Sequence, residues 1–480
     1  MTEHDKNLFI KEYSSAVKED NAAVFAGAGL SIPAGFVNWR ELLREIATDL
    51  GLEIDDETDL IAIAQYHFNK HKRAKINTLI AKEFLRGTTI TSNHEILSRL
   101  PIKTYWTTNY DTLIEESLRQ AFKTPDVKIH KGDFSRPIPK RDAVVYKMHG
   151  DISDVSKAII TRDDYETYDV NRRVFTTALQ GDLSTKTFLF IGFSFDDPNL
   201  SYILSRIRIL LEENQVKHYC FFKKVSRDQY DDSEDGERKF IREELRQELK
   251  IKDLERYNIN AYLVDNYAEI TELLEKVEAR LKRQSVFISG SAEEYGRWNR
   301  ENANNFVYRL SYELAKKYKI VTGFGLGIGS SVINGVLEHL YKTDYRHLDD
   351  ALILRPFPQN PPPNSDLGEL WQKYRQEILS NAGIAIFMFG NKVVDGKIVQ
   401  ADGVRKEFDI AISKGVKVIP IGATGYMARE IWEEVNQSYD DYFPANNELK
   451  KAISLLGEPT ISEDDIINNV VKAVGILHHS

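Results

Sequence analysis

The sequence contains very little cysteine, and this shortage excludes two kinds of cross-linked architecture. The only cysteine among the 480 residues is Cys220. A single thiol cannot form a disulfide within the chain, and it cannot supply the ligands of a cysteine-built zinc ribbon. We therefore expect no structural zinc and no other bound metal.

Long apolar runs and an excess of positive charge are also missing. No stretch approaches the roughly 20 apolar residues that a membrane-spanning helix needs. The first residues, MTEHDKNLFIKEY, have neither the basic region nor the apolar stretch of a secretory signal. A formal net charge of -9 gives no reason to expect a nucleic-acid groove. These absences predict a cytoplasmic protein that acts on small molecules and binds neither membranes nor nucleic acid.

The composition that remains is that of a folded protein with more than one domain. Hydrophobic residues make up 42% of the chain and charged residues 29%, as in ordinary soluble globular proteins. A chain of 480 residues is too long for one hydrophobic core and suggests roughly two to four domains.

Apolar runs suited to buried strands alternate with helical patterns in two successive series. The first series has strand-like runs at Ala22–Ala26, Thr104–Thr107, Val144–Met148, Thr187–Ile191 and Tyr219–Phe222, with helical patterns such as Trp39–Leu50 and Tyr110–Ala121 between them. The second begins near Ser285 with SVFISG, KIVTGFG, ALILRPF, GIAIFMFG and KVIPIG, each followed by a helical pattern. This alternation predicts parallel sheets covered by helices. The predicted fold class is α/β, with two Rossmann-like parallel-sheet domains.

Three segments help to place the domain boundary and the loops. A charged amphipathic helix over Tyr267–Arg283 separates the two series and predicts domains at 1–283 and 284–480. The acidic segment Asp231–Glu237 is expected to be a solvated loop. The proline-rich segment Pro356–Asn364 is expected to be a rigid loop, because proline excludes regular structure there.

Four short segments of the first domain follow predicted strands. They are GAGLS at 27–31, WTTNYD at 106–111, KMHGD at 147–151 and FIGFSFDDPNL at 190–200. Each alone has an ordinary structural explanation, such as a tight turn, a helix cap or a structural histidine. However, the carboxyl ends of parallel strands meet at one edge of the sheet, where open α/β sheets bind ligands. Glycines in such a turn also let the backbone approach a pyrophosphate.

The order and content of these four segments resemble the sirtuin family over roughly residues 10–280. The resemblance implies that Ala28, Gly29 and Ser31 lie against the phosphates of NAD. It also implies that Gly192 and Ser194 meet the adenosine side of the same molecule.

The same resemblance implies that Asn109 and His149 flank the nicotinamide ribose, with Asp111 near the carboxamide. We interpret Asn109 and His149 as the catalytic residues. An asparagine can hold a water or a ribose hydroxyl through its amide donor and its carbonyl acceptor. A histidine can accept a proton from either group near neutral pH. No cofactor beyond NAD as the substrate, and no covalent nucleophile, is needed.

Two departures from the sirtuin pattern bear on the reaction. Deacylating sirtuins carry a four-cysteine zinc module between the third and fourth segments, whereas Asp151–Ile191 contains no cysteine. The arginine-bearing continuation of the first segment is replaced by IPAGFVNW. Because the zinc module helps to form the acyl-lysine peptide cleft, the sequence favours hydrolysis of NAD. A nucleotide-regulated protein deacylase and a non-enzymatic NAD-binding scaffold remain as alternatives.

The second domain carries a glycine-rich loop, VTGFGLGIGSSV, before a helix that begins near Ser330. Such a loop can hold an anion. The series resembles the SLOG domain, a Rossmann-type relative of nucleotide-binding folds, over about residues 284–480. Enzymatic relatives carry a PGG-GT--E signature, of which this chain shows only AGIAIFMFGNK and the later Glu407. Ligand sensing is therefore favoured over hydrolysis of a nucleoside monophosphate.

A sirtuin-like domain followed by a SLOG domain resembles the effectors of Thoeris anti-phage defence. In that family a TIR-domain partner enzyme makes a cyclic ADP-ribose isomer, the SLOG domain binds it, and the NADase then depletes cellular NAD in an abortive infection. The family also implies a homo-oligomer, a tetramer or larger. The resemblance implies ligand contacts from Arg375, Lys392 and Glu407, with Ser291, Gly325 and Gly327 near phosphates.

Overall fold

The structure of the chain is a computed structural model that describes residues 1–85, 87, 89–343, 348–358 and 366–479. It divides into two compact units, Met1–Glu278 and Ala279–Ser480. The boundary predicted between residues 283 and 284 falls between helix α13 (Ala268–Lys282) and strand β8 (Ser285–Ser291). Most of the predicted proline-rich loop lies outside the described residues.

The first unit is built on a parallel sheet of seven strands. Their order across the sheet is β3-β4-β2-β1-β5-β6-β7, and all the pairings are parallel. The strands are β1 (Ala22–Ala26), β2 (Thr104–Thr107), β3 (Pro125–Lys128), β4 (Ala143–Lys147), β5 (Thr187–Ile191), β6 (His218–Lys223) and β7 (Ile259–Val264). Strand β1, with the sequence AAVFA, is buried along its whole length, as expected of a strand covered on both faces. The predicted α/β fold class is confirmed for this unit.

The strand order creates a natural binding edge next to β1. The chain builds the sheet outward from β1 through β2 on one side and then crosses to β5 on the other. The loops that follow the two groups of strands therefore diverge beside β1, which is where open α/β sheets bind ligands.

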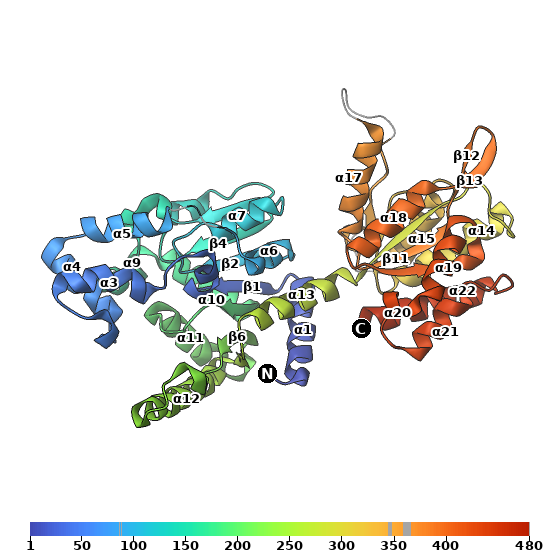
Figure 1. The fold of residues 1–480 in the computed structure, drawn as a ribbon. Coiled ribbons are helices and arrows are strands. Elements are labelled where there is room, and N and C mark those ends of the chain that lie inside the picture. The colour runs from blue at the N-terminus through green and yellow to red at the C-terminus, as the bar shows by residue number, and fades with distance from the viewer. Residues whose placement is uncertain (86, 88, 344–347, 359–365, 480) are drawn as a thin grey trace. The chain divides into compact units, whose positions relative to one another are not determined.

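Helices surround this sheet, and three of them form a separate small core. The helices of the unit are α1 (Glu3–Lys18), α2 (Ala28–Ser31), α3 (Trp39–Leu50), α4 (Leu60–His71), α5 (Ala74–Phe84), α6 (Ser92–Arg99), α7 (Leu113–Gln120), α8 (Arg162–Glu166), α9 (Tyr168–Asn171), α10 (Arg173–Thr185), α11 (Pro198–Leu211), α12 (Glu234–Leu254) and α13. Helices α3 to α5 share a core with Tyr110 and Ile160, and Arg73 anchors α5 by a 2.9 Å ion pair to Asp164. Tyr110, in the loop after β2, therefore packs against these three helices, which lie together within the first unit (Figure 1).

The second unit has its own parallel sheet of five strands, in the order β10-β9-β8-β11-β14. The strands are β8, β9 (Lys319–Thr322), β10 (Leu352–Leu354), β11 (Ile384–Phe389) and β14 (Lys417–Pro420). Each of the five strands predicted in this half is present. The chain order reverses between β8 and β11, so the switch point of this sheet lies between these two strands.

The helices of the second unit share one hydrophobic core with that sheet. They are α14 (Arg300–Ala315), α15 (Gly329–Tyr341), α16 (Leu348–Ala351), α17 (Leu367–Leu379), α18 (Asp402–Ser413), α19 (Tyr426–Gln437), α20 (Tyr439–Tyr442), α21 (Asn447–Leu455) and α22 (Glu463–His479). One expectation was wrong, because β11 is followed by a hairpin of β12 (Asn391–Val394) and β13 (Lys397–Gln400) and not directly by a helix. No helix among the described residues is long and apolar enough to cross a membrane.

Two further expectations differ from the structure of the first unit. The acidic segment was expected to be a loop, but α12 begins at Glu234 and runs through its second half. Ser233 caps this helix by accepting a hydrogen bond from Gly236 N at 3.0 Å, and acidic residues in a first helical turn are favourable. The helix expected from Tyr110 begins at Leu113, because Asp111 accepts a hydrogen bond from Leu113 N and turns the chain before the helix.

Candidate active site

The GAGLS turn and the end of β5 meet through their backbones. Gly27 N donates to Ile191 O at 2.9 Å, and Gly29 N donates to Gly192 O at 2.8 Å. A Cβ atom on Gly27 would lie 2.5 Å from Gly192 O, and one on Gly192, whose φ is +63°, would lie 2.1 Å from Leu30 N. Side chains are therefore excluded at this junction, which brings the first and fourth segments together.

The surface of this junction is accessible from solvent. Ala28 is half-buried, Gly29 and Ser194 are exposed, and Gly192 is half-buried at the end of β5. Ser31 is the exception, since its side chain is buried beneath the turn. The assignment of these residues to the phosphates and the adenosine side of NAD stays a prediction.

The side chain of Asn109 is fixed by the GAGLS turn. Its Nδ2 donates to Gly27 O and to Ser31 Oγ, both at 3.0 Å, and its backbone N donates to Thr107 Oγ1 at 2.9 Å. Because a main-chain carbonyl can only accept, the bond to Gly27 fixes the orientation of the amide. The amide donors were expected to hold a substrate or water, but they are used within the protein. Only Oδ1 remains as an acceptor for a ligand.

Asp111 presents one oxygen without a partner inside the protein. The residue is buried, and its Oδ1 accepts from Leu113 N at 3.1 Å. Its Oδ2 is buried and makes no hydrogen bond within the described part of the chain. A nearby imidazole does not supply a positive charge, because burial lowers the pKa of His94 to about 4 although the charge of Asp111 acts in the opposite direction. Asp111 Oδ2 therefore has unused hydrogen-bonding capacity among the described residues, and its assignment to the carboxamide of NAD stays a prediction.

His149 faces a carboxylate that the sequence did not reveal as its partner. Its Nε2 lies 3.1 Å from Asp197 Oδ2, and both side chains are 8% exposed. Tyr165 OH donates to the same oxygen at 3.3 Å. Burial alone would raise the pKa of Asp197, but the neighbouring His149 and the hydrogen bonds from Leu200 N and Tyr165 OH lower it below the ordinary value. The structure thus places an ionised carboxylate beside the predicted base.

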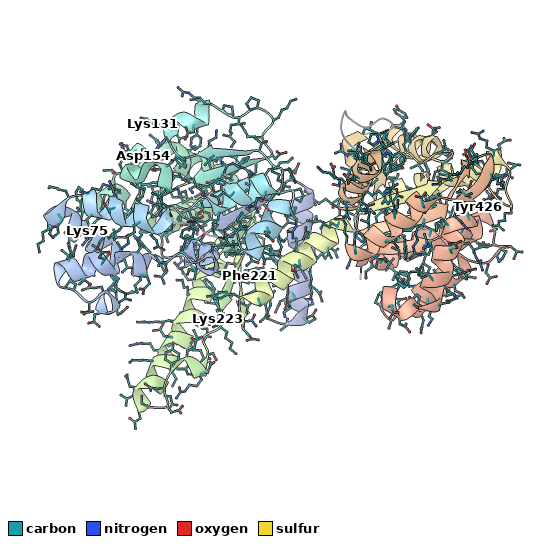
Figure 2. All side chains as sticks on the ribbon, turned by 45° about the horizontal axis from the view of Figure 1, so that its top comes forward. Lys75, Lys131, Asp154, Phe221, Lys223 and Tyr426 are labelled. Carbon is teal, nitrogen blue, oxygen red and sulfur yellow. The ribbon has the colours of Figure 1, made fainter. Side chains whose placement is uncertain are left out.

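Asp197 lies in the fourth segment, FIGFSFDDPNL, at the start of a helix. It caps α11, accepting from Leu200 N through Oδ1 at 2.9 Å, while Oδ2 faces His149. The loops after β2, β4 and β5 thus carry Asn109, His149 and Asp197 at the carboxyl edge of one sheet. Figure 2 labels Lys131 and Asp154, which follow β3 and β4 and lie on one side of the first unit.

The second unit has a comparable arrangement at its switch point. A Cβ on Gly325 would lie 1.8 Å from Gly290 O, and one on Gly327, whose φ is +78°, would lie 1.9 Å from Ala292 O. The glycine-rich loop is therefore in backbone contact with the end of β8. Ser291, half-buried beside it, donates to Asn391 O at 3.1 Å.

Asn391 organises this turn, a role that the sequence did not suggest. Its Oδ1 accepts from Glu293 N at 2.9 Å and Glu294 N at 3.0 Å, and its Nδ2 donates to Glu294 O at 2.8 Å. Tyr426 OH, labelled in Figure 2, donates to the Glu294 carboxylate at 3.3 Å. The fully buried Asn391 thus joins β12 to the turn after β8.

Arg375 and Glu407 lie together, whereas Lys392 pairs elsewhere. Arg375 Nε lies 3.8 Å from Glu407 Oε1, and Ser289 Oγ donates to Glu407 Oε2 at 2.5 Å. Burial raises the pKa of Glu407, while the Ser289 hydrogen bond and the charge of Arg375 act in the opposite direction. Lys392 forms an ion pair with Asp402 and is 41% exposed. The assignment of these residues to a cyclic nucleotide stays a prediction.

The interval that holds the zinc module in deacylating sirtuins is Asp151–Ile191 in this chain. It contains α8, α9, α10 and the whole of β5, and it has no cysteine. Among the described residues there is no group of three or more His, Cys, Asp or Glu side chains arranged to hold a metal ion.

A chelator therefore provides a direct test of the zinc prediction. We expect that neither EDTA nor added Zn²⁺ changes the rate of nicotinamide release from NAD, because one cysteine cannot build the usual four-ligand site. The measurement is the rate before and after dialysis against EDTA. A loss of activity that metal restores would contradict the prediction.

Comparison with known proteins places both units in one family. A profile described as STALD, the Sir2- and TIR-associating SLOG family, matches residues 269–477, and one described as a SIR2-like domain matches residues 103–252. The chain is 50% identical to NAD(+) hydrolase ThsA of Cytobacillus dafuensis, over 98% of this chain and 97% of that protein. It is 47% identical to NAD(+) hydrolase ThsA of Bacillus cereus, over 98% of both chains. A 26% identity to defense-associated sirtuin 2 of Bacillus subtilis covers 44% of this chain. Two relatives matched along nearly their whole length show that the chain belongs to the ThsA family of NAD(+) hydrolases.

Proposed function

We propose that this chain hydrolyses NAD to nicotinamide and ADP-ribose at the edge of the seven-stranded sheet. The observation that carries the proposal is the convergence of Asn109, Asp111 and His149 on one edge, with His149 backed by Asp197. The names of the ThsA relatives support the same reaction.

The reaction requires few groups from the protein. The bond between nicotinamide and ribose is weak because the leaving group departs neutral from a cation, and the transition state is oxocarbenium-like. Water attacks the anomeric carbon, nicotinamide leaves, and one proton is released. His149 accepts that proton, and the ionised Asp197 stabilises the resulting imidazolium.

The other residues orient the substrate. Asn109 Oδ1, the end of the amide that is not used within the protein, accepts a hydrogen bond from the attacking water or a ribose hydroxyl. Asp111 Oδ2 accepts from the carboxamide and so fixes the leaving group. Positioning of this kind contributes much of the rate in reactions that need no strong nucleophile.

Regulation is assigned to the second unit. We infer that a cyclic ADP-ribose isomer, made by a TIR-domain enzyme upon phage infection, binds between β8 and β11 and activates the hydrolase, so that cellular NAD is depleted. The glycine-rich loop offers backbone amides for phosphates, and Arg375 and Glu407 offer a cation and an acceptor for ribose hydroxyls. The family description, which names association with Sir2 and TIR proteins, supports this partner. The active form is proposed to be a cytoplasmic homo-oligomer.

A nucleotide-regulated protein deacylase is the alternative. It requires a cleft for an acyl-lysine peptide, to which the zinc module of deacylating sirtuins contributes, and this chain lacks the cysteines of that module. The test measures nicotinamide release from NAD with and without cyclic ADP-ribose isomers, and in parallel with an acyl-lysine peptide. Release that depends on the isomer and not on the peptide supports hydrolysis. Nicotinamide release that requires the peptide would contradict hydrolysis and support deacylation.

Asp197→Asn tests the support of His149. The amide keeps the oxygen that caps α11 but removes the charge that faces His149. The pKa of Asp197 is lower in the folded protein than its ordinary value. The charged carboxylate therefore stabilises the fold fully at a pH above the ordinary pKa, and this stabilisation is lost as the pH falls through the lowered pKa. We therefore expect a fall of about 10²-fold in kcat at neutral pH, with the KM for NAD little changed.

The neighbouring Asp196→Asn is the matched control. Asp196 is exposed and pairs with Lys250 at 2.7 Å on the surface, so its loss is expected to leave kcat unchanged. Equal activity of the Asp197→Asn protein and the wild type would refute the role given to Asp197.

A further inference from the structure

A buried lysine lies beneath the loops that carry the proposed active site. Lys147 is the last residue of β4, and its side chain is completely buried. Its Nζ lies 2.8 Å from Asp151 Oδ2 and 3.3 Å from Glu115 Oε1. It also donates to the main-chain carbonyl of Asp111. One ammonium group thus joins helix α7, the loop after β2 and the loop after β4.

The charges of this cluster keep the lysine protonated. Burial alone would lower the pKa of Lys147, but the nearby charges of Glu115, Asp151 and Asp111 raise it above the ordinary value. Burial also raises the pKa of Glu115. The charge and hydrogen bond of Lys147 keep the pKa of Asp151 low against the opposing effect of burial. The cluster is therefore centred on the Lys147–Asp151 pair, beside the buried carboxyl group of Glu115.

The contact with Asp111 is the functionally important one. The backbone already holds the preceding residue, because Ile152 N donates to Tyr110 O at 3.0 Å. Lys147 Nζ also donates to Tyr110 O at 3.4 Å, and it adds the next attachment along the chain, at the carbonyl of Asp111. Asp111 is the residue whose Oδ2, buried and without a partner among the described residues, is assigned to the carboxamide in the proposed function. Without the lysine, this part of the loop would lose its side-chain anchor to the loop that carries His149.

We propose that Lys147 is a positioning residue for NAD cleavage, which fixes the loop of Asn109 and Asp111 relative to the loop of His149. The inference rests on the proposed hydrolysis, which needs both loops around one ribose. Displacement of a reacting group by about 1 Å can cost roughly a hundredfold in rate. Lys147 touches no substrate in this proposal and acts only through the backbone and charges of the two loops.

Lys147→Met is the first variant, and Lys128→Met is its matched control. Lys128 is also buried in the same sheet, where it pairs with Asp126 at 2.8 Å and donates to Asp133 O at 2.6 Å. Neither of these two partners lies in the four segments of the proposed site. We expect both variants to be less stable in thermal unfolding. Per folded molecule, Lys147→Met should lose about 100-fold in kcat with KM changed by less than about threefold, while Lys128→Met should keep both constants.

The assay uses the full chain with NAD and the cyclic ADP-ribose isomer that activates it. Calorimetric titration with ADP-ribose counts the binding-competent molecules, so that loss of folded protein is not mistaken for loss of rate. Lys147→Met/Asp151→Asn provides a second test, because it removes both members of the charged pair while Asn keeps the acceptor used by Ser153 N. If Lys147 positions the loop, this double variant recovers stability but kcat stays low.

The outcomes separate the inference from the proposed function. Wild-type protein that releases no nicotinamide would overturn the proposed hydrolysis itself. If the wild type is active, near-normal kcat in Lys147→Met, or recovery of both stability and kcat in the double variant, would show that the cluster only stabilises the fold. The positioning role is supported if both variants have a low kcat although every molecule still binds ADP-ribose.

Discussion

Replacing Asn109 or His149 by alanine is expected to abolish nicotinamide release while the protein stays folded. Asn109 Oδ1 is the acceptor left for the water or ribose, and His149 is the base beside Asp197. Losses of single groups at a reacting centre commonly lower rates by about a hundredfold or more. The measurement is kcat for NAD in purified variants at saturating activator, with thermal unfolding as a check on the fold.

His218→Ala is the appropriate control for the loss of a buried imidazole. His218 begins β6, and its Nδ1 accepts from Phe188 N at 3.1 Å, away from the loops of the site. Burial lowers the pKa of His218 to about 3, so it is neutral and contributes packing and a hydrogen bond. We expect reduced stability with retained turnover. Near-normal turnover in either Asn109→Ala or His149→Ala would remove that residue from the catalytic role.

Most of the sheet framework could be predicted because its strands are short, buried and almost purely apolar. Residues 22–26 and 187–191 form strands with the predicted bounds. Two wrong predictions, at the hairpin after β11 and at the start of α12, concern segments whose sequences do carry a recognisable pattern. The hairpin after β11 has Asp395-Gly396 at its tip, both with positive φ, and Asp-Gly between apolar runs is a strong hairpin signal. Ser233 followed by acidic residues likewise marks the start of α12.

The candidate site was only partly predictable, because its pairs are formed by tertiary contacts. The segment order indicated Asn109 and His149, but no spacing rule relates His149 to Asp197, which lies on a loop after a different strand. Likewise, the use of both Asn109 amide donors by Gly27 and Ser31 depends on how the turn after β1 packs. Sequence patterns locate such loops at the edge of a sheet, while the partners of each atom follow from the packed structure.

Arg375→Ala and Glu407→Ala are expected to remove activation by the cyclic ADP-ribose isomer and to leave the NAD site intact. The two side chains lie 3.8 Å apart in a nearly buried pair, and Ser289 Oγ donates a hydrogen bond to the carboxyl group of Glu407. A nucleotide that contacts both residues would act directly on this pair. We therefore expect loss of either side chain to weaken the response of the second unit to the ligand.

The expected size of the effect follows from linkage. A ligand that prefers the active state 100-fold shifts the equilibrium by about 2.7 kcal/mol. One hydrogen bond to a charged group contributes about 1.5–3 kcal/mol, so losing a single contact can remove most of the activation. Ligand titration of NADase activity, together with calorimetric binding, measures both quantities in each variant.

The controls for this last experiment come from the same helix and the same pair. Arg405→Ala removes a partly exposed arginine of α18 that pairs with Asp409 and Glu434, and it should remain fully inducible. Because either single variant leaves a buried charge unpaired, Arg375→Met/Glu407→Gln removes both charges with little change in shape. We expect this double variant to be stable and unresponsive. Variants that lose ligand binding yet remain fully inducible would show that the second unit is not the switch.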